Sequence, residues 1–288
     1  ALTLAAGGRF PVTRVCTVLG VARSNIIRRR NQPAAWEDRR RRCRGQDEAL
    51  LADIRAVIDG RPTYGYRRVQ ALVNRQRRVD GTPRANHKAV YRAMLGAGLL
   101  LKRHATPCAE RTHDGRIAVA RSDQRWCSDG FEIGCDNGER VRVAFSLDCC
   151  DREAMSFVAT TRGIDGELVR DLMVASLEHR FGPVERAPRP IEWLSDNGSG
   201  YIAADTVAFG KELGLVIRRT PVQSPQSNGM AEAFVKTFKR DYVQIHERPT
   251  AASVLSQLPR WFEDYNRNHP HRALAMQSPR EFRAAQLE

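Results

Sequence analysis

The stretch Ser195-Asp196-Asn197-Gly198, followed later by Ser227-Asn228-Gly229-Met230-Ala231-Glu232, decides the fold of this chain. A third carboxylate stands upstream, in Trp126-Cys127-Ser128-Asp129. Spacing alone carries little weight, because 33 acidic residues in 288 produce many pairs at any chosen separation. The local context of each carboxylate therefore has to supply the information.

Asp196 and Glu232 each stand at the boundary of a regular element. Ile191-Glu192-Trp193-Leu194 is a short, largely apolar run typical of a strand, and Asp196 follows it in a Ser/Asn/Gly turn. Glu232 follows the segment 223–229, which cannot continue a regular element, and opens a run with helical periodicity. We therefore expect Asp196 at a strand end and Glu232 on a helix beside the buried face.

Asp129 falls inside the first strand of a predicted meander. The run 126–133 and the alternating run 141–147 are joined by a turn containing Asn137-Gly138, a strong hairpin signal. A third strand is predicted over 155–160 and a helix from about Asp165. The predicted order of elements then continues with the strand before Asp196, a helix near 205–213, the short run 215–217 and the Glu232 helix.

Carboxylates are the protein ligands that suit hard divalent cations, and two such ions can clamp the attacking and leaving oxygens of a phosphodiester. Three carboxylates on separate elements therefore indicate an enzyme that cuts or joins nucleic acid. The same order of elements resembles the RNase H-like catalytic core of retroviral integrases and DDE transposases.

The motifs Trp126-Cys127-Ser128-Asp129, Ser195-Asp196-Asn197-Gly198 and Ser224 to Glu232, with Lys239 seven residues beyond the glutamate, resemble those of the insertion-sequence-three family. The runs 126–131, 135–140 and 147–153 resemble the second-frame (OrfB) product of its insertion-sequence-two subgroup. The resemblance extends from about Pro62 to Arg283. It implies a mixed five-stranded α/β core flanked by helices, preceded by small all-α helix-turn-helix DNA-binding units.

The resemblance also implies the site and its cofactor. Asp129, Asp196 and Glu232 would be catalytic and would bind two Mg²⁺ ions, for which Mn²⁺ can substitute. The activity implied is that of a bacterial transposase that cleaves and joins DNA strands at the element's terminal inverted repeats and inserts the element into target DNA.

Charge indicates a nucleic-acid partner independently. Residues 1–125 carry 27 Lys+Arg and 10 Asp+Glu, a formal +17, and residues 126–288 carry 20 and 23, a formal −3, which together give the chain's +14. A basic half gains affinity for a polyanion by releasing counterions, whatever the base sequence. No apolar run reaches the roughly 18 residues of a membrane-spanning helix, and the expected location is the bacterial cytoplasm.

The basic half divides into two helical segments. We expect a helix-turn-helix-like or plain hairpin segment with an arginine-rich linker over 1–45, in which Ser24 caps the second helix, and a three-helix DNA-binding domain over 46–105. In the latter, helices are predicted over 50–58, 66–75 and 86–95. A linker over 106–118 and the catalytic core over 119–288 follow.

Six basic residues are candidate DNA contacts. In the helix-turn-helix domain the third helix would enter a major groove with Lys88 and Arg92, while Arg67 and Arg68 hold phosphates. The alternative is a basic helical domain that packs on the core or on a second protomer. On the Glu232 helix, Lys239 would face the scissile bond, with Lys236 the weaker candidate; either can instead be a solvated lysine.

Other polar groups are assigned structural roles. The acids Asp148, Asp151 and Glu153 are expected to end a strand and form its turn. Cysteines and histidines show no disulfide or zinc spacing. The C-terminal aromatic segment is expected to pack on the core, with Ser278 capping a last helix that begins at Pro279.

Three other functions remain open: a nuclease that does not join strands, a non-catalytic DNA-binding repressor, and a degenerate remnant. The family implies a multimer on double-stranded DNA and an upstream-frame product usually fused by frameshifting. The chain does not begin with Met, which is typical of a fragment or a processed protein, so it is expected to be incomplete as an enzyme.

Overall fold

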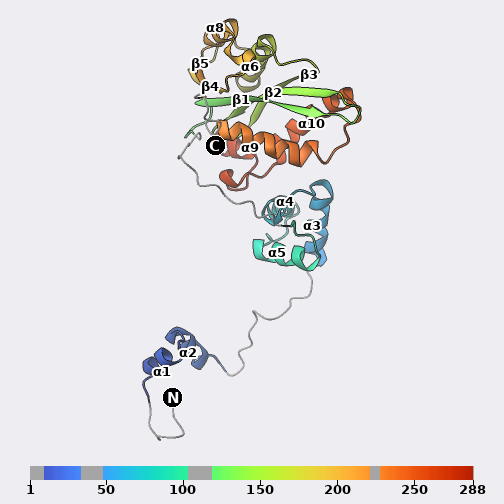
Figure 1. Ribbon diagram of the computed structural model, residues 1–288. Helices are drawn as coiled ribbons and strands as arrows, with labels where there is room; N and C mark the ends of the chain where they lie inside the picture. The colour runs from blue at the N-terminus through green and yellow to red at the C-terminus, as the bar shows by residue number, and fades with distance from the viewer. Residues whose placement is uncertain (1–9, 34–47, 103–118, 221–227, 288) are drawn as a thin grey trace. The chain divides into compact units, whose positions relative to one another are not determined.

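The computed structural model describes residues 10–33, 48–102, 119–220 and 228–287 (Figure 1). Its chain divides into two compact units, 1–47 and 48–288. Three segments named in the sequence analysis lie wholly or largely outside the described residues: the arginine-rich linker within 1–45, whose arginines fall at 39–44, the expected linker 106–118, and the stretch before Asn228. No described helix is long and apolar enough to cross a membrane.

The first unit contains two short helices, α1 (Val12–Val18) and α2 (Arg23–Arg30). The prediction that Ser24 caps the second helix is wrong. Ala22 occupies the cap position, and no side chain there accepts a hydrogen bond from the helix. Gly20, with a φ of +62°, follows the end of α1, and the extended backbone of Ala22 already precedes the first residue of α2, so Ser24 lies inside the helix.

Three helices follow, close to their predicted positions: α3 (Glu48–Gly60), α4 (Tyr66–Val79) and α5 (His87–Gly96). We call them the helical domain. Apolar side chains from all three pack into one core that includes Ile54, Val69 and Met94. The α4 helix runs four residues past its predicted end and stops before Gly81, whose φ is +67°.

A mixed sheet of five strands forms the centre of the remaining chain. The strands are β1 (Arg125–Gly134), β2 (Arg140–Asp148), β3 (Ala154–Thr160), β4 (Ile191–Ser195) and β5 (Leu215–Arg219). Their order is β3-β2-β1-β4-β5; β1, β2 and β3 are antiparallel neighbours, while β4 runs parallel to both β1 and β5. The predicted mixed five-stranded sheet is confirmed.

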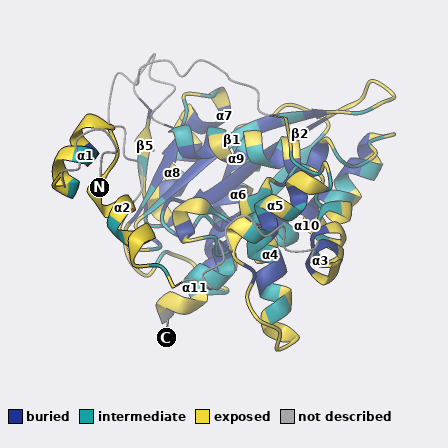
Figure 2. Ribbon diagram, turned by 90° about the horizontal axis from the view of Figure 1, so that it is seen from below, coloured by how far each residue is buried: buried dark blue, intermediate teal, exposed yellow. Residues whose placement is uncertain are grey.

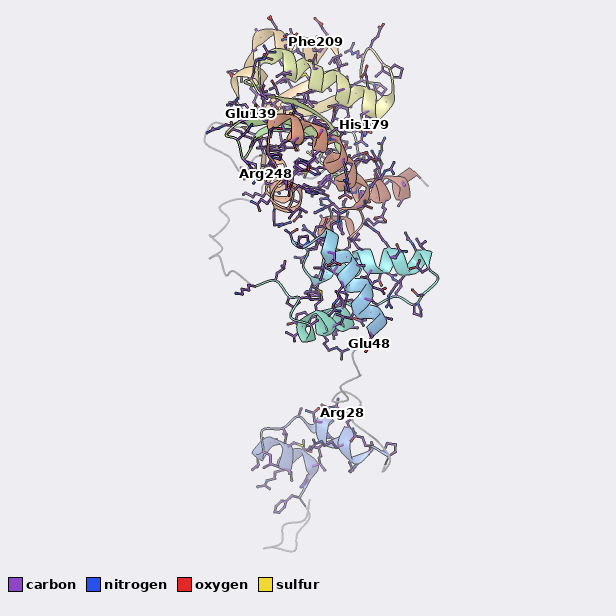
Figure 3. The ribbon with its side chains drawn as sticks, turned by 90° about the vertical axis from the view of Figure 1, so that its right-hand side faces the viewer. Arg28, Glu48, Glu139, His179, Phe209 and Arg248 are labelled. Carbon is purple, nitrogen blue, oxygen red and sulfur yellow. The ribbon has the colours of Figure 1, made fainter. Side chains whose placement is uncertain are left out.

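The hairpin between β1 and β2 turns where Asn137-Gly138 predicted it. Gly138 has a φ of +88°, which an L side chain rarely adopts. The tip is held by the start of the long C-terminal helix and the segment before it: the N–H of Asp136 donates to the carbonyl of Arg248 at 2.8 Å, and the Glu139 carboxylate accepts the N–H of Ala251. Figure 3 labels Glu139 and Arg248.

Helices cover both faces of the sheet (Figure 1). One face carries α6 (Gly166–Phe181), whose buried residues form a core with Trp126 and Trp193 of the sheet, and α8 (Ala204–Glu212) lies beside it. The opposite face carries α9 (Gly229–Phe238) and α10 (Ala251–Asn268). The strands between them are largely buried, whereas the outer helix faces are exposed (Figure 2).

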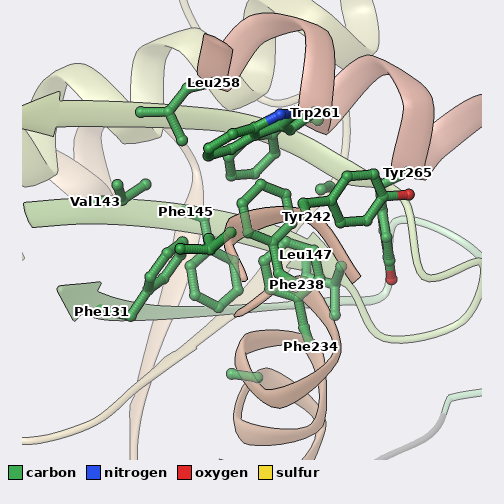
Figure 4. Packing of buried hydrophobic residues seen from close by; sticks show 14 of the residues in the cluster. Phe131, Val143, Phe145, Leu147, Phe234, Phe238, Tyr242, Leu258, Trp261 and Tyr265 are labelled. Atoms are coloured by element: carbon green, nitrogen blue, oxygen red, sulfur yellow. The ribbon is translucent and has the colours of Figure 1, made fainter. Parts of the chain in front are cut away.

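Aromatic rings dominate the core on the α9 side (Figure 4). Phe234 of α9 lies 4.4 Å from Phe145 of β2 and 4.9 Å from Tyr265 of α10, measured between ring centroids. Phe238 contacts Phe131 of β1 and Phe262 of α10. Because these rings lock α9 against β1, the helix that carries Glu232 has a fixed position relative to the strand that carries Asp129.

Beyond α9 the chain continues directly into a π-helical turn, η2 (Lys239–Val243), and after α10 it forms η3 (Arg272–Leu274) and α11 (Pro279–Leu287). The predicted cap of the last helix is confirmed. The Ser278 hydroxyl accepts the N–H of Glu281, while the Glu281 carboxylate accepts the N–H of Ser278 at 2.8 Å, which is a reciprocal capping box.

Candidate active site

The sheet register places Asp129 beside Asp196. In the parallel pairing of β1 with β4, Cys127 stands opposite Leu194. Asp129 and Asp196 are each two residues further along, so the same register brings them side by side at the end of β4. Asp129 lies within β1 and Asp196 directly after β4, as predicted.

The Asp196 turn is held by its own polar groups. The Asp196 carboxylate accepts the N–H of Gly198 at 3.0 Å, and the Asn197 amide donates to the Thr220 carbonyl at 3.1 Å. A Cβ on Gly198 would approach the Asp196 carboxylate to 3.1 Å, and one on Gly200 would come within 2.9 Å of a backbone carbonyl. The residues after Asp196 therefore shape the turn. Gly198 leaves room for the Asp196 carboxylate, and Gly200 lets the turn pack against the backbone at Asp165.

Glu232 reaches the same region from α9. Burial raises the pKa of Asp129 to about 6, a backbone hydrogen bond from Gly130 opposes this, and the nearby charges of Asp196 and Glu232 add to it. The strand register thus brings Asp129 and Asp196 together, and Glu232 on α9 lies near enough for its charge to act on Asp129.

A pocket of about 320 Å³ opens at this point, lined by both aspartates and by Tyr201. Arg142 of β2 and Glu132 of β1 also line it, and their side chains form an ion pair at 3.2 Å. Sequence reasoning missed these two residues. Their outward positions on adjacent strands could have signalled them only once the register of β1 with β2 was known.

Lys236 of α9 and Lys239, the first residue of η2, have different surroundings. The Lys236 ammonium stands 3.5 Å from the Glu232 carboxylate, and both groups are exposed. The Lys239 ammonium lies 5.8 Å from the centroid of the Phe131 ring, in a cation–π contact, and Lys239 is half-buried. Lys239 therefore has a defined position, while Lys236 forms a weak surface pair.

The carboxylates suit a hard divalent cation, although within the described part of the chain no three His, Cys, Asp or Glu side chains are arranged to hold a metal ion as they stand. The Asp129 pKa is raised partly by its neighbours' charges, and a divalent cation would remove that repulsion. The ion pair of Glu232 with Lys236 is too weak to compete with such a cation. The donor set fits Mg²⁺ on these grounds.

The acids Asp148, Asp151 and Glu153 form a separate structural cluster. All three are buried and make ion pairs with the guanidinium of Arg180 of α6, which is also buried; the Arg180–Glu153 distance is 3.0 Å. The guanidinium compensates for several charges held away from water. Their expected structural role, at the turn after β2, is confirmed.

The candidate DNA contacts of the helical domain have different surroundings. Lys88 and Arg92 are exposed on α5, and Arg67 lies over the ring of Tyr66. Arg68 is half-buried, and its guanidinium contacts the buried Asp241 of η2 at 3.1 Å. Arg68 thus joins the helical domain to the part of the chain that contains the sheet and its helices, which we call the sheet domain.

Other contacts reinforce this joint, which sequence reasoning did not predict. The hydroxyl of Thr63 donates to Asp241 at 2.6 Å. The hydroxyl of Tyr64 meets the ring nitrogen Nδ1 of His269 at 2.8 Å, with both side chains buried. These pairs are about 180 to 205 residues apart in the chain. No local sequence signal could have shown them.

Comparison with known proteins agrees with this architecture. Residues 119–225 and 213–279 match family models described as "Integrase core domain", and residues 45–105 match one described as "HTH-like domain". Among solved structures, a chain of the simian T-cell lymphotropic virus intasome has a TM-score of 0.49 at 15% identity, covering 69% of this chain and 66% of that one. That similarity is too low to support any conclusion about function.

Curated relatives are much more similar. "Transposase InsD for insertion element IS2A/D/F/H/I/K" of Escherichia coli is 48% identical over 280 residues, which cover 97% of this chain and 92% of the relative. "Transposase InsD for insertion element IS2-9" of Escherichia coli K12 is 48% identical over 97% of this chain and 90% of its own length. The chain belongs to the InsD-type transposases of IS2-like insertion elements, enzymes built on an integrase core with an HTH-like helical domain before it.

Proposed function

We propose that this transposase cleaves and joins DNA strands at the terminal inverted repeats of its element, with Asp129, Asp196 and Glu232 as the catalytic residues. The observation that carries the proposal is their convergence. The register of β1 with β4 sets Asp129 beside Asp196 at one pocket, and Glu232 on α9 lies near enough for its charge to act on Asp129. Like charges held together disfavour folding, and a bound divalent cation would offset their repulsion.

The three carboxylates would hold two Mg²⁺ ions, for which Mn²⁺ can substitute. When bound, these ions supply Lewis acids that stabilise charge on the attacking and leaving oxygens of a phosphodiester. The protein holds the three donors on elements that the aromatic core fixes together. Lys239, already positioned over Phe131, would hold a DNA phosphate beside the carboxylates. Lys236 would become free for a phosphate once Glu232 binds metal.

We propose the division of labour expected from the sequence, with DNA recognition in residues 1–45 and 46–105, a linker over 106–118 and chemistry in 119–288. The α5 helix offers Lys88 and Arg92 to DNA from its exposed face. Its first turn is held by Asn86, whose side chain accepts the N–H of Lys88.

A basic groove beside α4 supports DNA binding by this region. It has a volume of about 860 Å³ and lies between α4 and the segment 275–285. Its lining includes Arg75, Arg77, Arg78 and Arg84. Of these, Arg78 and Arg84 are exposed and have no ion-pair partner among the described residues. Arginines that the protein itself does not neutralise are available to phosphates.

The roles of Arg67 and Arg68 at phosphates stay predictions. The ion pair of Arg68 with Asp241 favours docking of the helical domain as its main role. Assembly as a homo-oligomer on double-stranded DNA, and participation of an upstream-frame product, are part of the same proposal.

The decisive assay uses a labelled oligonucleotide with the terminal repeat that flanks the encoding gene, together with Mg²⁺. Wild type is compared with Asp129→Asn, Asp196→Asn and Glu232→Gln, and with Asp171→Asn, an exposed acid on α6 as the matched control. We expect each site variant to lose cleavage and joining by at least a thousandfold and to keep DNA binding, while the control retains both activities.

The outcomes separate the alternatives. A site variant that keeps wild-type cleavage and joining contradicts the catalytic assignment. Cleavage by wild type without joining of a pre-cut end identifies a simple nuclease. Binding without either reaction, indifferent to the three substitutions, identifies a repressor.

A second experiment tests the DNA-reading role of α5. Lys88→Ala combined with Arg92→Ala should weaken binding to the terminal repeat. The slope of log affinity against log salt concentration should become shallower, by the equivalent of roughly one to two phosphate contacts. The control is Arg55→Ala, which removes an exposed arginine from α3 of the same domain. If affinity and salt slope stay at wild-type values in the double variant, α5 does not face DNA.

A further inference from the structure

Ser128 immediately precedes Asp129 in β1 but points to the other face of the sheet. Side chains alternate along a strand, so Ser128 shares its face with Trp126, whereas Asp129 shares its face with Cys127 and Phe131. Ser128 is fully buried, with 0% of its surface exposed. A hydroxyl in such a place requires a hydrogen-bond partner.

That partner is Tyr201, which lies just beyond Asp196. The Ser128 and Tyr201 hydroxyl oxygens are 2.8 Å apart. Tyr201 belongs to the single helical turn α7 (Ser199–Ile202), and its N–H donates to the carbonyl of Gly198. The Ser128 hydroxyl thus connects the strand of Asp129 to the turn that carries Asp196, from behind the pocket that Tyr201 lines.

The backbone of Ser128 makes a second connection, to the start of the Glu232 helix. The side-chain amide of Asn228 donates to the Ser128 carbonyl at 3.2 Å. Asn228 is the N-cap of α9, one helical turn before Glu232, and it is 5% exposed. Its amide is therefore held inside the protein, against β1.

Asn228 departs from the usual role of an asparagine at this position. An N-cap asparagine normally accepts a hydrogen bond from the first turn of its helix, but this side chain makes no such bond. Asn228 therefore makes no capping bond, and its side-chain oxygen is buried without a partner among the described residues. The bond from its amide to the Ser128 carbonyl is the hydrogen bond that this side chain does make.

We propose that Ser128, Tyr201 and Asn228 are positioning residues of the metal site. Through one buried serine, the elements that carry Asp129, Asp196 and Glu232 are cross-linked behind the carboxylates. None of the three side chains needs to touch metal or DNA. The inference rests on the proposed function, because it assumes that those carboxylates bind the metal ions.

Such a cross-link is needed for a physical reason. Three like charges repel, so elements that bring them together tend to separate when no cation is present. Mg²⁺ also demands near-ideal geometry at short distances, and small misplacements of the ligands are costly. Hydrogen bonds behind metal ligands commonly govern metal affinity by ten- to a hundredfold.

The structure offers a matched control for the test. Ser146 of β2 stands directly opposite Ser128 in the sheet register, and it is also 0% exposed. Its hydroxyl lies 2.6 Å from the hydroxyl of Ser176 of α6. Ser146→Ala therefore removes a buried hydroxyl at the equivalent level of the neighbouring strand. Neither β2 nor α6 carries any of the three carboxylates.

The experiment measures Mn²⁺ affinity, strand cleavage and melting temperature for Tyr201→Phe, Ser128→Ala, their double variant and Ser146→Ala. We expect Tyr201→Phe and Ser128→Ala each to weaken Mn²⁺ binding about tenfold and to slow cleavage at saturating Mn²⁺ by about ten- to a hundredfold. Their melting temperatures should fall no further than that of Ser146→Ala, whose Mn²⁺ affinity should be unchanged.

The double variant should resemble either single variant, because both substitutions remove the same hydrogen bond. Asn228→Ala acts on a different bond and should add its effect to that of Tyr201→Phe. The inference is overturned if Tyr201→Phe changes Mn²⁺ affinity no more than Ser146→Ala does. If Asp129→Asn itself keeps wild-type Mn²⁺ affinity and cleavage, the proposed catalytic site fails instead, and the two failures are distinct.

Discussion

Substitution of Asp129 by asparagine should abolish catalysis and yet stabilise the metal-free protein. The pKa of Asp129 in the folded protein is about 6, against an ordinary value of 3.8, with burial as the main cause and the two neighbouring carboxylates contributing. A raised carboxylate pKa means that the folded state disfavours the ionised form. Asparagine removes the charge, and its side-chain oxygen can keep the hydrogen bond from the Gly130 N–H.

The magnitude follows from the difference between the two pKa values. At pH 8 the carboxylate is ionised in both folded and unfolded states, and the difference corresponds to about 3 kcal/mol as an upper limit. Because Asp129 is only half-buried, solvent screening reduces the expected gain to about 1–2 kcal/mol.

The pH dependence has a definite sign. Below pH 3.8 the carboxylate is protonated in both states and the penalty is absent. As the pH rises from 3.8 to about 6, the wild type loses stability relative to the variant, and above 6 the difference stays constant.

Urea denaturation with a chelator, at pH 4 and pH 8, measures this difference, and Asp171→Asn serves as the control. Addition of Mg²⁺ should then stabilise wild type more than Asp129→Asn. The reasoning is refuted if the variant is no more stable than wild type at pH 8, or if its advantage does not shrink at pH 4.

Three further predictions concern other parts of the molecule. Arg180→Met should lower the free energy of unfolding by about 3–5 kcal/mol, since it leaves buried carboxylates without a counter-charge; a loss below about 1 kcal/mol in urea denaturation would contradict this. Tyr64→Phe should leave the buried Nδ1 of His269 without its partner, destabilising the docked helical domain by about 1–3 kcal/mol. Hydrogen exchange should then quicken in α4 and remain slow in β2, and equal changes in both would refute a local effect. Gly200→Ala should lower Mn²⁺ affinity, because its Cβ would stand 2.9 Å from a backbone carbonyl, whereas Gly163→Ala meets no atom within 4 Å and should leave the affinity unchanged.

The sheet domain could be predicted from the sequence because its signals are local. A run of aromatic, small and apolar residues marked β1, alternation marked β2, Asn137-Gly138 marked the turn between them, and the Ser/Asn/Gly run marked the end of β4. Side-chain alternation and turn preferences act over a few residues, and they do not depend on what lies across the fold. The three carboxylates were found because each stands next to such a signal.

The remaining features depend on contacts between distant residues. No sequence pattern around Ser128 predicts the hydrogen bond of its hydroxyl with Tyr201. No pattern around Arg68 predicts its ion pair with Asp241. The π-helical turn after α9 likewise has no pattern of its own. Ser24 shows the opposite failure: a residue type suited to capping stands near a helix start, but the cap is Ala22, two residues earlier.

The continuation of α9 into η2 bears on how such enzymes can diversify. Asp241, in the turn that directly follows the helix of Glu232, receives Thr63 and Arg68 of the helical domain. In a hybrid whose helical domain comes from a relative, the loop before α4 and the first turn of α4 would also come from that relative. These are the parts that contact the buried Asp241. Transplants that keep the partners of Asp241 should yield folded hybrids, and those that do not should fail for reasons unrelated to DNA. If α5 reads DNA as proposed, its exposed face can vary without disturbing the fold, whereas the loop before α4 must keep the residues that contact Asp241.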